Sequence, residues 1–185
     1  MGSAMRASLP DVTTDAGQEV ARRVLESLAR RGETLATAES LTGGLLSARL
    51  TDVPGASRSF VGGVVSYATR VKVSVLDVPA GLVEEHGVIS EECASAMAYG
   101  VRTRLGATWG VATTGVAGPD EQEGRAVGTV WVAVAGPDHL EARELSLDGD
   151  RQAIRQATCD AVLTVLEALV AGEDGILPRE EPGLG

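Results

Sequence analysis

The segment TAESLTGG, residues Thr37 to Gly44, decides the fold, because it predicts a strand that turns directly into a helix. The residues Thr34 to Ala38 have the composition of a short buried strand, and Gly43 to Thr51 are typical of a helix. Ser40 therefore stands at the end of a strand, in front of two glycines at a helix start. The turn is either a tight connection or a site that exposes Ser40 as a nucleophile, and the segment alone favours the connection.

The rest of the chain alternates between strand-like and helix-like segments. The first helix is predicted from a cap at Thr14 or Asp15 to about residue 31, and two more at about residues 43–51 and 69–76. A helix capped by Ser90 is predicted to run to about residue 105, and a last one, capped by Asp148 or Asp150, to about residue 171. Strands are predicted at 34–38, 60–68, 108–115, 127–135 and 139–147. Residues 77–87 are expected to be connecting sequence with one helical turn at most. This order predicts an α/β domain with a mixed sheet, whose last two strands form an antiparallel hairpin.

Composition limits the classes of function. The formal net charge of −10 argues against general binding to nucleic acid or to anionic membranes, which need a basic surface. The two cysteines, Cys93 and Cys159, lie far apart inside amphipathic patterns, so we expect buried thiols rather than a disulfide or a metal site. Fifteen of the sixteen basic residues are arginine, and the single lysine is Lys72. Unlike arginine, a buried lysine can act as a base.

The sequence predicts one domain with short terminal extensions. We expect residues 1–13 to be a disordered or tag-derived start, residues 14–171 the domain, and residues 172–185 a flexible acidic tail containing proline and glycine. No run approaches 18 apolar residues and no signal peptide opens the chain, so a cytoplasmic protein is expected.

Three residues could form a nucleophilic site without histidine. Ser40 needs a base, and only His86 and His139 are available for a triad; both stand in segments expected to be surface or structural. Tyr67 and Lys72 follow a strand of the same domain, at the sheet edge where α/β proteins bind ligands. A lysine whose pKa is lowered by burial, with Arg70 as a second candidate cause, can accept the serine proton. The alternative is a surface lysine and a half-buried interface tyrosine.

Two further segments could bind an anion or a nucleotide. In TTGVAGPDEQEGRAVGTV, residues 113–130, glycines would let backbone amides approach a ligand, but the pattern is neither a P-loop nor a Rossmann fingerprint. Arg151 stands in the first turn of the last helix, where a cation opposes the helix dipole. An anionic ligand for Arg151 and a pairing with Asp148 or Asp150 are equally good explanations.

These motifs occur together in one known family. The segments AESLTGG, FVGGVVSYATRVK, TGVAGPD with VGTVW, and GDRQAIR occur in that order. Over about residues 20–170 the chain resembles the CinA C-terminal domain family, whose enzymes are nicotinamide-nucleotide amidohydrolases. The resemblance implies a three-layer α/β/α domain and hydrolysis of nicotinamide mononucleotide (NMN) to nicotinate mononucleotide and ammonia, without metal or cofactor. It implies no nucleic-acid or membrane partner, and a homo-oligomer stays open.

Carried over residue by residue, the resemblance assigns the family's serine, tyrosine and lysine to Ser40, Tyr67 and Lys72. Ser40 would attack the amide carbon, and Lys72 with Tyr67 would accept its proton. Backbone amides near Thr42, Gly43 and Gly44 would hold the oxyanion. The expected ribose and phosphate contacts are Thr114, Gly115, Gly118 and Arg151.

The chain also departs from the family pattern. Glu121-Gln122 stand where family loops usually have a Gly-Gly pair, and Ala126 stands where a proline commonly precedes V-G-T-V. If this loop contacts the nucleotide, affinity or specificity differs. Two alternatives to the NMN amidohydrolase therefore stay open, namely a non-catalytic nucleotide-binding module and an amidase for another small amide.

Overall fold

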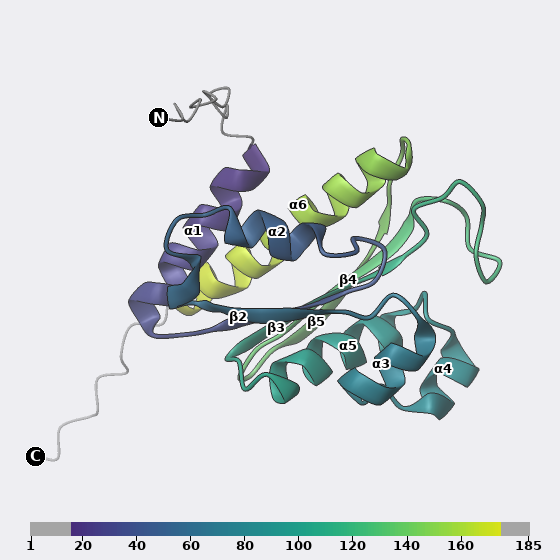
Figure 1. The fold of residues 1–185 in the computed structure, drawn as a ribbon, viewed down its shortest axis with the longest axis horizontal. Coiled ribbons are helices and arrows are strands. Elements are labelled where there is room, and N and C mark those ends of the chain that lie inside the picture. Colours follow the sequence, from purple (N-terminus) through teal and green to yellow (C-terminus); the bar gives the residue numbers. More distant parts are fainter. Residues whose placement is uncertain (1–15, 175–185) are drawn as a thin grey trace, which may run out of the picture.

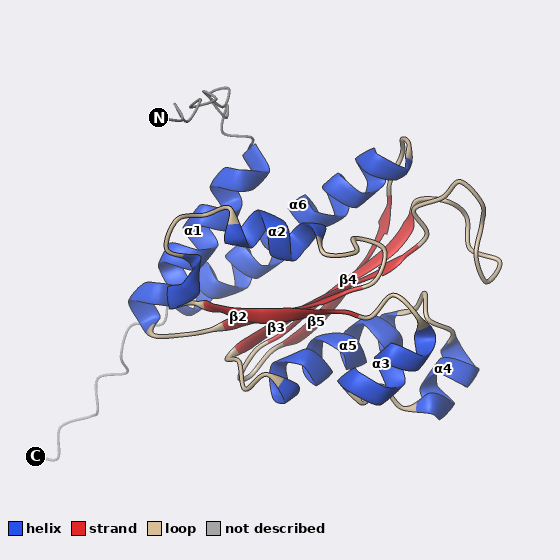
Figure 2. Cartoon of the chain, viewed as in Figure 1, coloured by secondary structure: helices blue, strands red, loops and turns tan. Residues whose placement is uncertain are grey.

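A computed structural model describes residues 16–174 and shows an α/β domain built in three layers (Figure 1). One helical layer consists of α1 (Ala16–Arg31), α2 (Leu45–Thr51) and α6 (Arg151–Asp174), and the other of α3 (Thr69–Leu76), α4 (Ala80–His86) and α5 (Glu91–Arg104). The sheet lies between them (Figure 2). Its strands are β1 (Leu35–Glu39), β2 (Phe60–Val65), β3 (Trp109–Gly115), β4 (Thr129–Ala135) and β5 (Leu140–Ser146), and a short 3-10 turn covers Ala56–Arg58.

The sheet is mixed, as the sequence predicts. Its strand order is β2-β1-β3-β4-β5, with β1 parallel to both of its neighbours and β4 antiparallel to β3 and β5. The central strands β1 and β3 are almost entirely buried, because helices cover both of their faces. Their carboxyl ends lie side by side, so Ser40 and the loop after β3 meet at the end of the sheet where the parallel strands finish.

Two aliphatic cores, one on each face of the sheet, hold the layers together. One lies against α1, α2 and α6, and the other against α5 and α3. Trp109 is the one described aromatic residue that is fully buried, and valine, leucine and alanine fill most of the remaining space, as the composition predicts. The fully buried side chains include two charged groups, Glu39 at 0% and Lys72 at 1% exposure.

Local capping explains several element boundaries. The Ser90 hydroxyl accepts a hydrogen bond from the Cys93 N–H and starts α5, and Asp150 accepts one from the Ala153 N–H and starts α6. Helix α3 has the predicted bounds. Helix α6 continues to Asp174, past the expected boundary at residue 171, and the rest of the expected tail and all of residues 1–13 lie outside the described residues.

The expectation for residues 77–87 is wrong, because seven of them form helix α4. Pro79 precedes this helix, Gly81 lies inside it, and none of its side chains is buried. It therefore has no apolar stripe that would reveal it in the sequence. Within residues 16–174, no helix has the length and apolarity needed to cross a bilayer.

Candidate active site

Ser40 lies directly after β1 and is held by its own backbone. Its N–H donates to the Thr113 carbonyl at 2.9 Å, which continues the pairing with β3 for one more residue. Its carbonyl accepts from the Gly43 N–H at 3.1 Å, which closes the turn. The hydroxyl is left to face a cavity of about 160 Å³ at the carboxyl ends of the parallel strands. The tight connection and the exposed hydroxyl are therefore both present.

Glu39, the last residue of β1, shapes this turn. Its carboxylate is fully buried and accepts four hydrogen bonds, from the N–H groups of Gly44 (2.9 Å), Leu46 (3.1 Å) and Ser47 (2.8 Å) and from the Ser47 hydroxyl (2.6 Å). These amides lie at the start of α2, where no helical carbonyl can satisfy them, and a negative charge there also complements the helix dipole. Glu39 therefore fixes α2 immediately behind Ser40.

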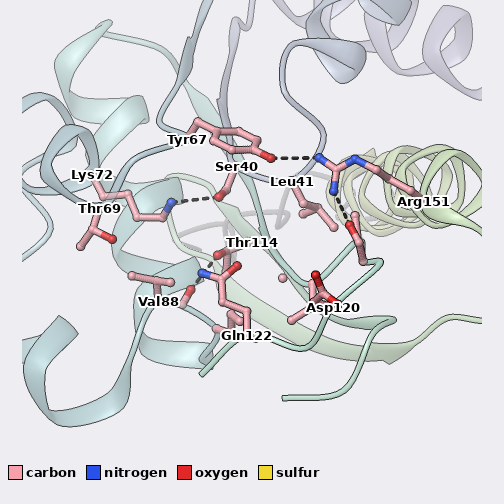
Figure 3. A pocket seen from close by; sticks show the side chains of 15 residues that line it. Ser40, Leu41, Tyr67, Thr69, Lys72, Val88, Thr114, Asp120, Gln122 and Arg151 are labelled. Carbon is pink, nitrogen blue, oxygen red and sulfur yellow. Dashed lines mark hydrogen bonds between the residues drawn. The ribbon is translucent and has the colours of Figure 1, made fainter. Parts of the chain in front are cut away.

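Lys72 reaches Ser40 from helix α3. Its Nζ donates to Ser40 Oγ at 2.9 Å and to the Ser66 carbonyl at 2.7 Å (Figure 3). The aliphatic stem is enclosed, so the ammonium group has lost most of its water. This desolvation lowers the pKa of Lys72 below its usual value of 10.5, although the charges of Cys93 and Glu123 oppose the shift. Of the two expected causes, burial therefore lowers this pKa, and Arg70 is not among the contributing charges.

Tyr67 lies beside this pair but points away from it. Its hydroxyl accepts a hydrogen bond from Arg151 Nη2 at 2.9 Å, and the side chain is 60% exposed (Figure 3). Arg151 also donates to the Gly118 carbonyl at 2.6 Å. No hydrogen bond joins Tyr67 to Ser40 or Lys72, the residues with which it was expected to act. The pairing of Arg151 with Asp148 or Asp150 is not found either, and Arg151 instead crosses the mouth of the cavity.

The expected oxyanion-binding turn is used for other contacts. Thr42, Gly43 and Gly44 do not line the cavity. The Gly43 amide donates to Ser40 and the Gly44 amide to Glu39, so both already have acceptors. The Thr42 hydroxyl is buried against that of Thr113 at 2.8 Å. A turn that starts a helix needs its amides for capping, and here capping takes precedence over ligand binding.

The β3–β4 loop, residues 116–128, forms the wall opposite Ser40. The expected contacts Thr114, Gly115 and Gly118 do line the cavity, together with Arg151. The Thr114 hydroxyl is engaged, because it donates to the Val88 carbonyl at 2.6 Å. Asp120 and Gln122 also line this wall (Figure 3). The sequence singled out the loop that carries these two residues but did not name them as site residues, since charged loop residues usually face solvent.

The other candidate groups lie outside the cavity, as expected. His139 stacks on Trp109 with ring centroids 6.1 Å apart, and His86 lies beside Glu92. Both cysteines are free and buried, and burial raises the pKa of Cys93 to about 11. Among the described residues, no group of three or more His, Cys, Asp or Glu side chains could hold a metal ion.

Comparisons with known proteins bear on the family and the fold of this chain. The family model for the CinA C-terminal domain matches residues 17–170. A CinA-like protein of Frankia casuarinae is 53% identical over 158 residues, which are 85% of this chain and 36% of that protein. A putative competence-damage inducible protein of Desulforamulus reducens is 45% identical over 84% of this chain and 38% of its own length. The chain thus spans little more than a third of the length of these curated relatives.

Solved structures match over their whole length. A CinA superfamily protein from Klebsiella pneumoniae superposes with a TM-score of 0.82 at 33% identity, over 85% of this chain and 99% of that one. The competence/damage-inducible protein of Agrobacterium tumefaciens superposes with a TM-score of 0.81, also at 33% identity, over 88% and 99% of the two chains. The family match and these likenesses show that the chain belongs to the CinA C-terminal domain family.

Proposed function

We propose that this protein is an amidohydrolase that cleaves the carboxamide of NMN with Ser40 as nucleophile and Lys72 as base. The observation that carries the proposal is the 2.9 Å contact between Lys72 Nζ and Ser40 Oγ at the inner end of the cavity. A serine hydroxyl is a weak nucleophile until a base takes its proton, and an unprotonated lysine amine supplies one. Both structural needs of such a pair, contact and desolvation, are met here.

The first half of the reaction forms an acyl-enzyme. When Lys72 is neutral, the same contact runs in the opposite direction, with the Ser40 O–H donating to the amine lone pair. Ser40 Oγ attacks the amide carbon while its proton moves to Lys72, giving a tetrahedral intermediate. The intermediate collapses when the C–N bond breaks, and Lys72 returns the proton to the leaving nitrogen, which departs as ammonia.

The second half reverses these roles. A water molecule takes the place vacated by ammonia, gives a proton to Lys72 and attacks the ester carbon. The C–O bond to Ser40 breaks, the serine regains its proton from Lys72, and the carboxylic acid leaves. The Ser66 carbonyl keeps the amine in place throughout, because its hydrogen bond at 2.7 Å does not depend on the substrate.

The mouth of the cavity suits a nucleotide phosphate. Arg151 is exposed there and is held by two neutral acceptors, the Gly118 carbonyl and the Tyr67 hydroxyl. No carboxylate of residues 16–174 forms a salt bridge with this guanidinium, which therefore has charge left for an anion and can bind phosphate in a two-point geometry. In this arrangement Tyr67 acts by holding Arg151 and not by moving the serine proton.

The experiment is release of ammonia from NMN by the wild-type chain and three variants. Ser40→Ala and Lys72→Arg are expected to lose activity by about 10³-fold or more, because one removes the nucleophile and the other a usable base. Ser74→Ala, on the exposed face of α3, is the matched control and is expected to behave as wild type.

No release from the wild type would refute the proposal, and tight NMN binding without turnover would favour a binding module. Near-normal turnover by Lys72→Arg would refute Lys72 as the base.

A further inference from the structure

Strand β2 leaves one edge of the sheet open. It pairs with β1 on one side, and no described strand covers its other side. The Ser66 N–H points toward β1, because it donates to the Glu39 carbonyl at 2.8 Å. In a parallel pair, the backbone groups of successive residues point alternately toward the neighbouring strand and away from it. The N–H and C=O groups of Val65 and Gly63 therefore point away from β1, toward the open side. These groups are hydrogen-bonding sites that another strand can use.

The two edges of the sheet differ in chemistry. The opposite edge, β5, has the sequence LEARELS, in which Glu141, Arg143 and Glu144 supply the charges that normally keep a sheet edge from pairing. The β2 sequence FVGGVV has no charge and no proline. Only a bulge where Val61 leaves the register with β1 interrupts it. One edge of the same sheet is therefore protected and the other is not.

The open edge is also apolar on its surface. Val61 is 52% exposed and Val65 is 48% exposed, since the short helix α2 does not cover them. Of the eight large hydrophobic side chains exposed in residues 16–172, six lie on or next to β2, α3 and α5, namely Val61, Val65, Tyr67, Val75, Tyr99 and Leu105. Solvent-facing valines on an unpaired strand favour association.

We propose that β2 pairs with β2 of a second copy of this chain, antiparallel and about a two-fold axis at Gly63. This register sets Gly63 opposite its equivalent and Val61 opposite Val65 of the partner subunit. It joins two five-stranded sheets into one continuous sheet. The partner strand would lie beside Ser66 and Tyr67, which follow Val65 directly, so the interface borders the cavity.

Two observations favour a second copy over a different partner. The edge is self-complementary, because the alternate residues Val61, Gly63 and Val65 give the same order of side chains in either direction along the strand. A two-fold axis requires a surface of this kind. In addition, two copies that each carry a charge of −10 repel one another over most of their surface, and β2 is an uncharged place where they can approach.

Sedimentation equilibrium at micromolar concentrations tests the association. The wild type is expected at twice its mass of 19.0 kDa, and Val61→Lys and Val65→Lys at the monomer mass with unchanged circular dichroism. Val127→Lys is the matched control, because Val127 is exposed on the β3–β4 loop, and it is expected to stay dimeric. A monomeric wild type would overturn the proposal, as would dimeric lysine variants.

Disulfide trapping tests the register. Residues opposite one another in a hydrogen-bonded antiparallel pair have Cα atoms about 5.5 Å apart, within reach of a disulfide. Mixing Val61→Cys with Val65→Cys protein under mild oxidation is expected to give a cross-linked dimer, whereas each variant alone is not. The native thiols do not interfere, because both are buried. Equal cross-linking of Val61→Cys with itself would rule out the Gly63 axis.

Discussion

Replacing Glu39 with glutamine tests whether this buried carboxylate holds the turn that carries Ser40. In the wild type two carboxylate oxygens accept four hydrogen bonds. The variant keeps the size of the side chain but exchanges one oxygen for an NH2 group that cannot accept. The Ser47 hydroxyl can rotate to adapt, but a backbone N–H cannot. Whichever way the amide is turned, at least one buried N–H loses its partner.

The expected cost follows from these contacts. A buried donor left unpaired costs about 1–3 kcal/mol, and the remaining bonds lose the added strength of a charged acceptor, so Glu39→Gln should lower the free energy of unfolding by about 2–4 kcal/mol. Urea denaturation followed by circular dichroism measures it, and an unchanged m-value shows that the folded state is intact. Turnover of NMN should fall as well, since Ser40 is the next residue.

A matched control separates this effect from general loss of an acid. Glu26→Gln changes an exposed carboxylate that pairs with Arg22 on the surface of α1, so the free energy of unfolding should change by less than about 0.5 kcal/mol. If Glu39→Gln is as mild as Glu26→Gln, the carboxylate does not hold the start of α2 and the reasoning is refuted.

Three further outcomes are expected. Burial lowers the pKa of Lys72 below 10.5, and the neutral amine is the proposed base. The value of kcat/KM for NMN should therefore rise with pH as Lys72 loses its proton, and a falling profile contradicts the assignment. Tyr67→Phe should raise KM with little change in kcat, since its hydroxyl contacts Arg151; a large loss of kcat would restore Tyr67 as a proton carrier. Gly63→Ala should destabilise the fold by at least about 1 kcal/mol in thermal melts, because its Cβ would strike a buried threonine hydroxyl, whereas Gly81→Ala, with open space around it, should not.

The sequence predicted the fold well where a pattern is local. The turn after β1, the bounds of α3 and the caps of α5 and α6 each follow from a few neighbouring residues with known preferences. Helix α4 could not be predicted, because its side chains all keep some contact with solvent and its Pro79 and Gly81 resemble a loop. It packs against the next helix, α5, which is a tertiary contact that its own residue pattern does not reveal.

The candidate site was predictable only in its chemistry. The rarity of lysine pointed to Lys72, and the structure brings it to Ser40. The role of Glu39 depends on the amides at the start of α2 coming within hydrogen-bonding distance of its carboxylate. The orientation of Tyr67 depends in the same way on Arg151, which is far away in sequence. A side chain at the end of a strand can turn to either side, and spacing along the chain does not decide which.

The two walls of the cavity come from different parts of the chain. Ser40 and Lys72 are fixed by contacts with the ends of β1, β2 and β3 and with α2 and α3, while much of the facing wall is the β3–β4 loop, which contributes none of these contacts. Substitutions in that loop can therefore accumulate in evolution without moving the serine and the lysine. Under the proposed function, this arrangement gives a lineage a way to alter which amides enter while it inherits the same reacting groups, and Glu121-Gln122 stand in the segment where such changes would fall.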